Sequence, residues 1–326
     1  MKLIATEEHF LTPEVRNAWQ QASENDATQN LHLGEMENRL EDITNTRISL
    51  MNETGIDVQV LSLTSPSLHN LSSDASIHLA KQTNDMLAEV IKSKPDRFQG
   101  FAALPMPAPT EAAKELERAV TKLGLKGAML CGRTQEKNLD LPDFWPLFEC
   151  AEQLNAPIFI HPQIPQKAVR DVYYSGFNNE VDLAFATYGL GWHYEAGIQF
   201  VRLVLAKVFD RFPNLQIILG HWGEVILFYL ERLASLNRTA KLEKPFADYV
   251  RQNLYVTSSG MFSNTYLQRS VDIIGADRIL FSADYPYQYR PGRDARNFLE
   301  KTPLTEVDKM KFANGNWETL ISKIKH

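Results

Sequence analysis

The 326-residue chain has few cysteines, no long apolar segment and no cluster of basic residues. Its two cysteines, Cys131 and Cys150, are too few for a disulfide framework, which makes a reducing compartment the default expectation. No apolar run approaches the roughly 18 residues that a membrane-spanning helix needs. The N-terminus, MKLIATEEHF, becomes charged too early for a signal peptide. These absences predict a soluble, cytoplasmic protein without a membrane partner.

Two further absences narrow the class of protein. The 34 basic residues are mixed with 40 acidic ones for a net charge of -6, so a nucleic-acid partner is not expected. The chain also lacks a glycine-rich phosphate loop after its first predicted strand, where it reads Glu7-Glu8-His9 instead. An open, doubly wound dinucleotide-binding sheet would need that loop, so this fold is disfavoured.

Short apolar segments alternate with longer amphipathic ones along the chain, which is typical of a parallel sheet built from βα units. Strands are expected at Leu3–Thr6, Val58–Leu63, Gln99–Leu104, Gly127–Leu130, Ile158–His161, Ile217–Gly220, Leu254–Ser258 and Ile279–Ser282. Apolar residues recur at helical spacing in Arg39–Glu53, Ala75–Lys92, Glu111–Leu123, Phe144–Leu154, Glu195–Asp210 and Val225–Ser235. The pattern predicts an α/β fold, a (β/α)₈ (TIM) barrel, as one domain over residues 1–326.

Two long insertions interrupt the alternation. One, Leu11–Asn38, follows strand one, and the other, Pro162–His193, follows strand five. Both come after the C-terminal end of a strand, where the active sites of such barrels are built. We therefore expect both insertions to border the functional site.

Side chains of the types that bind metals stand at the C-terminal ends of four predicted strands. These are Glu7 and His9 after strand one, His161 at the end of strand five, His221 and Glu224 after strand six, and Asp284 after strand eight. Residues two apart in an extended segment point to the same side, so Glu7 and His9 can face the barrel mouth together. Imidazole and carboxylate ligands suit zinc, manganese and iron(II), so the pattern predicts a site for a divalent metal ion.

Each of these residues also has a structural alternative. A single histidine at a strand end is commonly a hydrogen-bonding residue, and Asp284 could cap the following helix. The metal interpretation depends on the convergence of all the strand ends at one rim. A solvated or structural role is expected for the histidines elsewhere, which are His32, His69, His78, His193 and His326.

Around these residues the sequence resembles a known family. The blocks IATEEHF, TRISLM, PDRFQGFAALP, IFIHP, VFDRFPNLQIILGHWGE and ADRILFSADYPYQY are similar to one branch of the amidohydrolase superfamily. That branch contains aminocarboxymuconate semialdehyde decarboxylase and the γ-resorcylate, 2,3-dihydroxybenzoate and 5-carboxyvanillate decarboxylases. The resemblance covers nearly the whole chain, and its most specific parts are GHWGE and RILFSADYPY.

The resemblance implies one divalent ion, zinc or manganese, with the ligands Glu7, His9, His161 and Asp284. Some relatives have alanine in place of His9, which leaves open whether this ligand is obligatory. Asp284 would also deliver a proton to the substrate, with His221 beside the metal and Glu224 helping to set its protonation state. Loss of CO₂ from the protonated ring restores aromaticity, so no organic cofactor is expected.

The implied activity is that of a carboxy-lyase acting without an oxidant on an ortho-hydroxylated aromatic acid, such as a dihydroxybenzoate. By resemblance, Arg47 lies near the substrate carboxylate, Trp192 contacts the ring, and Arg232 reaches the site of a neighbouring subunit in a homodimer or homotetramer. The structural alternatives are surface ion pairs for the arginines and core packing for Trp192. Cys131 stands where several relatives have asparagine, which leaves the ring substituents undetermined.

Two other functions stay open at this point. Related barrels with a similar mononuclear site open lactones with metal-activated water, whereas many binuclear hydrolases carry a carboxylated lysine at the end of strand four. Residues 128–133, AMLCGR, contain no lysine, which argues against a binuclear hydrolase but not against a mononuclear lactonase. A barrel that binds a metal only for stability is the third alternative. It is disfavoured because strand-end carboxylates buried without a substrate to serve would be costly.

Overall fold

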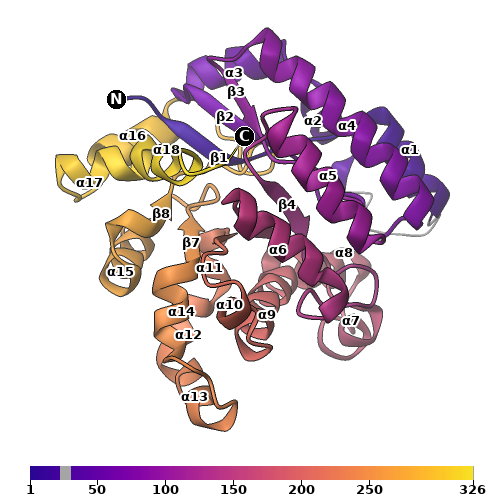
Figure 1. The fold of residues 1–326 in the computed structure, drawn as a ribbon. Helices are drawn as coiled ribbons and strands as arrows, with labels where there is room; N and C mark the ends of the chain where they lie inside the picture. Colours follow the sequence, from indigo (N-terminus) through magenta and orange to yellow (C-terminus); the bar gives the residue numbers. More distant parts are fainter. Residues whose placement is uncertain (23–30, 326) are drawn as a thin grey trace.

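Parallel strands run in chain order around the centre of the protein in the computed structural model, which describes residues 1–22 and 31–325 (Figure 1). They are β1 (Ile4–Phe10), β2 (Val58–Leu63), β3 (Phe98–Gly100), β4 (Ala128–Cys131), β5 (Ile158–His161), β6 (Ile217–Leu219), β7 (Leu254–Thr257) and β8 (Ile279–Leu280). Strands β1–β3 pair in one sheet and β4–β8 in another. Single bridges, Ala102 with Ala128 and Glu8 with Tyr285, join the two sheets on both sides. The predicted α/β barrel is confirmed.

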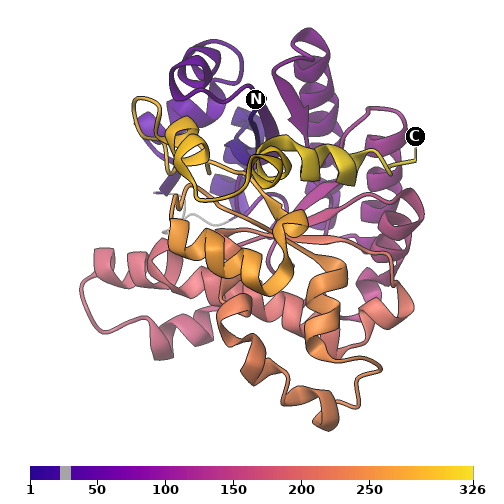
Figure 2. The same ribbon diagram turned by 90° about the vertical axis from the view of Figure 1, so that its left-hand side faces the viewer.

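Helices surround the strands, as the two views in Figures 1 and 2 show. The helices that follow β1 to β4 are α1 (Pro13–Ala22), α2 (Glu35–Glu41), α3 (Thr46–Thr54), α4 (Ser73–Ser93), α5 (Pro109–Thr121) and α6 (Trp145–Leu154). Those that follow β5 and β6 are α7 (Lys167–Tyr173), α8 (Asn179–Ala184), the π-helical turn η3 (Phe185–Gly189), α9 (Gly191–Leu205), α10 (Val208–Arg211), α11 (His221–Glu224), α12 (Ile226–Leu233), α13 (Leu236–Thr239) and α14 (Phe246–Asn253). The last are α15 (Asn264–Ile274), α16 (Asp294–Lys301), α17 (Glu306–Met310) and α18 (Asn316–Ile321). None of the described helices is long and apolar enough to cross a membrane.

The apolar periodicity of the sequence places the core. Helix α5, for example, buries Ala112, Leu116, Ala119 and Val120, which recur at the three- and four-residue spacing of one helix face. A separate cluster of buried strand residues includes Val60, Phe101 and Phe159, with Trp317 of α18 packed edge-on against Phe101 at 5.5 Å between ring centroids. Large side chains thus fill the space between the strands, which leaves their C-terminal ends for the functional site.

The single helix predicted over Arg39–Glu53 is wrong, because the chain forms two helices there, α2 and α3. The break lies at Asp42, whose carboxylate accepts hydrogen bonds from the backbone N–H groups of Asn45, at 2.9 Å, and Thr46, at 2.7 Å. A side chain that accepts from the first N–H groups of a helix favours a new helix start. The helix predicted over Glu195–Asp210 is likewise divided, because Lys207 adopts a left-handed conformation between α9 and α10.

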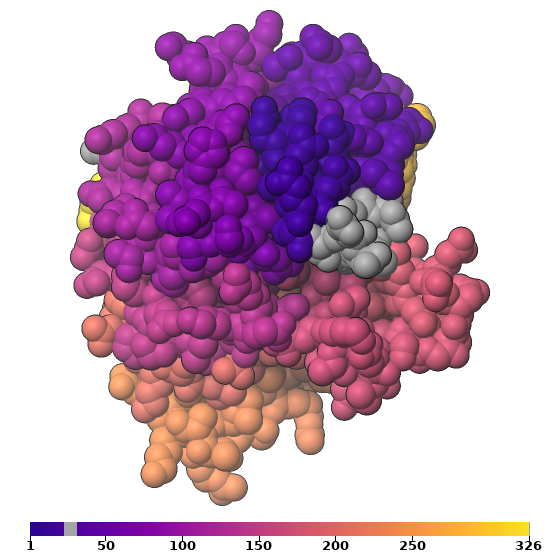
Figure 3. All heavy atoms as spheres, turned by 90° about the vertical axis from the view of Figure 1, so that its right-hand side faces the viewer, coloured from indigo at the N-terminus to yellow at the C-terminus, as the bar shows by residue number. Residues whose placement is uncertain are grey.

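The segments that follow β1 and β5 lie beside the C-terminal ends of the strands. Within Leu11–Asn38, residues 23–30 lie outside the described residues, and the rest forms α1 and the beginning of α2. Pro162–His193 forms α7, α8, η3 and the beginning of α9. Figure 3 shows this second segment, coloured pink, projecting from the body of the barrel.

Candidate metal centre and active site

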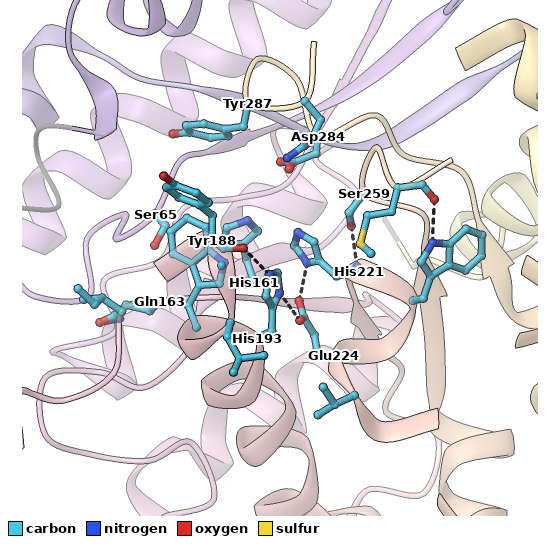
Figure 4. A pocket seen from close by; sticks show the side chains of 18 of the residues that line it. Ser65, His161, Gln163, Tyr188, His193, His221, Glu224, Ser259, Asp284 and Tyr287 are labelled. Atoms are coloured by element: carbon cyan, nitrogen blue, oxygen red, sulfur yellow. Dashed lines mark hydrogen bonds and ion pairs between the residues drawn. The ribbon is translucent and has the colours of Figure 1, made fainter. Parts of the chain in front are cut away.

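A cavity of about 940 Å³ opens at the C-terminal ends of the strands. Its polar wall includes His161, His193, His221, Glu224, Asp284 and Tyr287, several of which point toward one another in Figure 4. Its apolar wall includes Ile164, Trp192, Leu227, Phe228 and Met261. An apolar cavity with a few convergent polar groups is the usual form of a small-molecule site.

The four predicted metal ligands meet beside this cavity. The ligand atoms of Glu7, His9, His161 and Asp284 all lie within 4.8 Å of one another, and all four residues are buried. His9 Nε2 is 3.3 Å from Asp284 Oδ1, and His161 Nε2 is 3.7 Å from Glu7 Oε1. Ligands at about 2.0–2.2 Å from one ion lie roughly 3–4 Å apart, so these separations suit a shared cation.

Two buried polar atoms that lack a hydrogen bond indicate that a cation fits this quartet. Among the residues that the structure describes, Glu7 Oε1 and His9 Nε2 are buried and have no hydrogen-bond partner. Burying polar atoms without partners costs free energy, and a divalent ion would satisfy both. Without an ion, burial raises the pKa values of Glu7 and Asp284 to about 7 and lowers that of His9 to about 3. Each shift favours the neutral form of the side chain. A cation in the quartet would instead favour the charged carboxylates of Glu7 and Asp284.

Hydrogen bonds behind the quartet orient two of its ligands. Glu7 Oε2 accepts from Ser259 Oγ and from Thr257 Oγ1, the latter at 2.9 Å, which turns Oε1 toward the other ligands. His161 Nδ1 lies 2.9 Å from the backbone oxygen of Pro162, which can only accept, so Nδ1 carries the hydrogen and Nε2 offers its lone pair. The sequence analysis did not identify the hydroxyl groups of residues 257–259 as part of the site. Their position at the C-terminal end of β7 is the signal that could have identified them.

The segment after β6 holds the next functional pair. His221 and Glu224 both have positive φ angles, 48° each, and so do Trp222 and Val225, at 59° and 66°. This left-handed turn brings His221 Nδ1 to 2.6 Å from Glu224 Oε1. Burial opposes the charged form of His221, but the Glu224 carboxylate outweighs it and raises the pKa of His221 to about 10. Burial likewise opposes the charge of Glu224, but His221 and His193 lower its pKa to about 2.

The expectation for His193 was wrong, because it lies in the cavity wall and not in a solvated or purely structural position. Its Nδ1 is 2.9 Å from Glu224 Oε2, and its ring centroid is 4.5 Å from that of His221. Helix α9 begins at Gly191, four residues before the predicted start, and this places His193 in its first turn. His32 also lines the cavity, with Nδ1 at 2.8 Å from the hydroxyl of Tyr287.

The remaining histidines lie elsewhere. His69 is buried and accepts a hydrogen bond from the backbone N–H of Cys131 at 3.1 Å, which is a structural role. His78 is exposed on α4, and His326 lies outside the described residues. Cys131 is buried and does not line the cavity, and burial raises the pKa of its thiol to about 12.

The three predicted substrate-binding residues are placed differently from one another. Trp192 lines the cavity, and its buried Nε1 has no partner among the described residues. Arg232 is exposed on α12, outside the cavity of its own chain. Arg47 is fully buried and does not line the cavity. Its guanidinium donates to the backbone oxygen of His9 at 2.6 Å and stacks on the ring of Tyr285, so we replace its expected substrate role with a bracing one.

This barrel, with a histidine and carboxylate quartet at its mouth, defines the class of protein. Residues 9–319 match the amidohydrolase family model, and the chain belongs to this family. It is 34% identical to a γ-resorcylate decarboxylase from Polaromonas sp. strain JS666, over 97% of each chain.

Solved structures give the same picture. The 5-carboxyvanillate decarboxylase of Sphingomonas paucimobilis is 31% identical with a TM-score of 0.90 over 99% of both chains. A dihydroxybenzoic acid decarboxylase from Polaromonas sp. JS666, solved with manganese and the inhibitor 2-nitroresorcinol, is 33% identical with a TM-score of 0.85, over 98% of this chain and 97% of the other. The expected family branch is confirmed, and these relatives favour the decarboxylase over the hydrolase alternative.

Proposed function

We propose that the protein is a metal-dependent decarboxylase that releases CO₂ from an ortho-hydroxylated aromatic acid, such as a dihydroxybenzoate. The observation that carries the proposal is the buried quartet of Glu7, His9, His161 and Asp284, in which two atoms lack a hydrogen bond, beside the His221–Glu224 pair. Relatives of nearly equal length that are named decarboxylases support the reaction. The manganese in one of their structures supports Mn²⁺ or Zn²⁺ as the ion, and we expect no organic cofactor.

The residues of the cavity suit this chemistry. A divalent ion in the quartet would supply positive charge that orients the phenolate and carboxylate oxygens of the substrate. Asp284 lines the cavity, and by the family resemblance it is the group that delivers the proton to the ring carbon that bears the carboxylate; metal ligation, burial and the neighbours His221 and Glu224 would together set its protonation state. Cleavage of the bond to CO₂ then restores aromaticity. His221, held through Nδ1 by Glu224, is placed to hydrogen-bond the substrate, and Trp192 offers its ring and a free Nε1.

The test is a substrate screen. Protein loaded with Mn²⁺ or Zn²⁺ is offered a panel of hydroxybenzoates, with CO₂ release as the readout, and a panel of lactones, with acid release as the readout. We expect CO₂ from at least one ortho-hydroxybenzoate and none from the His161→Ala variant. Lactone opening without CO₂ from any phenolic acid would overturn the proposal in favour of a mononuclear hydrolase.

We also propose that the protein works as a homodimer or homotetramer in which Arg232 of one subunit completes the site of another. Helix α12 carries a strongly exposed Phe228, 76% accessible, whose side chain also lines the cavity. Arg232 follows Phe228 by four residues and therefore lies on the same face of α12. Tyr188 of η3, 58% accessible, lines the same cavity as Phe228, and Ile198 of α9 is 49% accessible. An exposed apolar surface beside a cavity suits a subunit interface.

A further inference from the structure

His193, His221 and Glu224 form a second group of metal-type ligands in the cavity, apart from the quartet. Their ligand atoms all lie within 4.8 Å of one another. As Figure 4 shows, both imidazoles face one carboxylate, with Nδ1 of His221 at 2.6 Å from Glu224 Oε1 and Nδ1 of His193 at 2.9 Å from Oε2. Two histidines and one glutamate are a ligand set of catalytic zinc sites.

The hydrogen bond of His193 Nε2 leaves the other ring nitrogen, Nδ1, available to bind a metal ion. His193 Nε2 lies 3.3 Å from the backbone oxygen of Tyr188, which can only accept, so this nitrogen carries a hydrogen. A carbonyl behind one nitrogen is the usual support for a histidine that binds a metal through the other. Nδ1 of His193 can therefore face Glu224 either as an N–H donor or as a lone pair directed at a cation.

A cation can reach this cluster with little rearrangement. The cavity is lined by His193, His221 and Glu224, and the side chain of His193 is 20% accessible to solvent. Around zinc, nitrogen and oxygen ligands at about 2.0–2.2 Å from the ion lie roughly 3.3 Å apart. The two N–O pairs, at 2.6 and 2.9 Å, therefore need to separate by roughly 0.4–0.7 Å. The open cavity leaves room for a fourth, water ligand.

We propose that His193, His221 and Glu224 form a second divalent-cation site, selective for Zn²⁺ over Mn²⁺, whose occupation inhibits the enzyme. Such nitrogen-rich sites bind Zn²⁺ more tightly than Mn²⁺. Each Nδ1 that binds the ion releases its hydrogen to solvent, so the ion replaces the N–H groups that hold both histidines on Glu224. His221 is then fixed on the ion and no longer available to the substrate. Binding is independent of the proposed decarboxylase function, and only the inhibition rests on it.

The first experiment counts bound ions. Metal-free wild-type, His193→Gln and His32→Gln proteins are titrated with Zn²⁺ in equilibrium dialysis, and zinc per chain is measured. His32 is the matched control, a histidine of the same cavity outside the cluster. We expect two ions per chain for the wild type and for His32→Gln, and at least about 10-fold weaker binding of the second ion in His193→Gln, because even losses behind the ligands cost 10–100-fold in affinity. A His161→Ala, Asp284→Asn protein should retain one ion that His193→Gln removes.

The second experiment measures activity. Zinc added to Mn²⁺-loaded enzyme should inhibit the wild type and His32→Gln over the concentration range in which the second ion binds, and should inhibit His193→Gln only at concentrations at least about 10-fold higher. One zinc per wild-type chain, or a second zinc that His193→Gln does not weaken, would overturn the site. A second zinc that binds through His193 without inhibiting would overturn the inhibition. The ion count decides the binding even if no CO₂ release is found.

Discussion

A Cβ atom on Gly220 would lie 2.8 Å from Oε1 of Glu7 and 2.9 Å from Oγ of Ser259. The residue before His221 therefore has no space for a side chain, although its φ of -71° would allow one. The last residue before α11 and the metal-facing oxygen of β1 leave no room for a methyl group between them, so the two sides of the site are built against each other.

This contact predicts that Gly220→Ala weakens metal binding. The added methyl group must push the Glu7 carboxylate away from the other ligands, and we expect at least a roughly 10-fold loss of metal affinity. Zinc or manganese titration of the metal-free protein is the measurement. Gly315→Ala, at a helical φ of -60° with no neighbour closer than 3.3 Å, is the control and should bind normally. Equal affinity in the two variants would contradict the packing argument.

Removing the quartet's ligands should remove the metal. We expect His161→Ala and Asp284→Asn each to lower the metal content of the quartet and to abolish CO₂ release, because each loses an ion ligand. Elemental analysis after dialysis against a limited metal supply gives the content. Retention of full metal content by the double variant, with the second site blocked by His193→Gln, would show that the ion binds elsewhere.

His221 should matter for turnover more than for metal binding. His221→Asn is expected to lower kcat by roughly 10²–10⁴-fold, the range for a group that assists proton transfer. The metal content of the quartet should stay near that of the wild type, because His221 is not among its ligands. Near-normal kcat would leave His221 with a structural role only.

The His221–Glu224 pair should make stability depend on pH. The pKa of His221 is raised from 6.5 to about 10 in the folded state, so its contribution is complete below pH 6.5 and is lost as the pH rises toward 10. In the metal-free protein, we expect the free energy of unfolding to fall over this window, and to fall less in Glu224→Gln. Urea unfolding at several pH values measures it. Parallel curves for the two proteins would mean that Glu224 does not stabilise the imidazolium.

Arg232 should act across a subunit interface. Asp284→Asn and Arg232→Ala are each expected to be inactive, yet mixing them under conditions of subunit exchange should restore part of the activity. In a mixed dimer, one site carries both changes and the other carries neither. If exchange is confirmed by mass spectrometry of mixed dimers and no activity returns, Arg232 acts within its own chain or not at all.

The barrel and the metal quartet could be predicted because they follow from local sequence. Strand periodicity places each strand in the chain, and in a parallel barrel the C-terminal ends of all strands meet at one rim. Glu7 and His161 lie far apart in the chain, yet both stand within strands, β1 and β5. To predict that these two side chains meet, it was enough to know the number and order of the strands.

The surroundings of the quartet could not be predicted, because they depend on irregular backbone. His193 reaches Glu224 because α9 begins at Gly191, before the first residue of its apolar pattern. Apolar periodicity could not predict this first turn, because the turn is polar. Arg47 carries the same charge whether it binds a substrate or a backbone carbonyl, so only the fold shows that it braces His9. The break at Asp42 could not be predicted either, because the hydrophobic spacing continues from α2 into α3 without interruption.

The left-handed turn of α11 also has a consequence for how this protein can be modified. Val225 is β-branched and has a φ of 66°, a conformation that costs about 1–3 kcal/mol for a residue with a side chain. Hydrogen bonds from His221 N–H to Ser259 and from Trp222 Nε1 to the Met261 oxygen hold the turn in place. A Val225→Gly change would remove this strain and so stabilise the folded protein, and it would also let His221 move. Selection for thermostability should therefore find gains at this turn that come with slower catalysis.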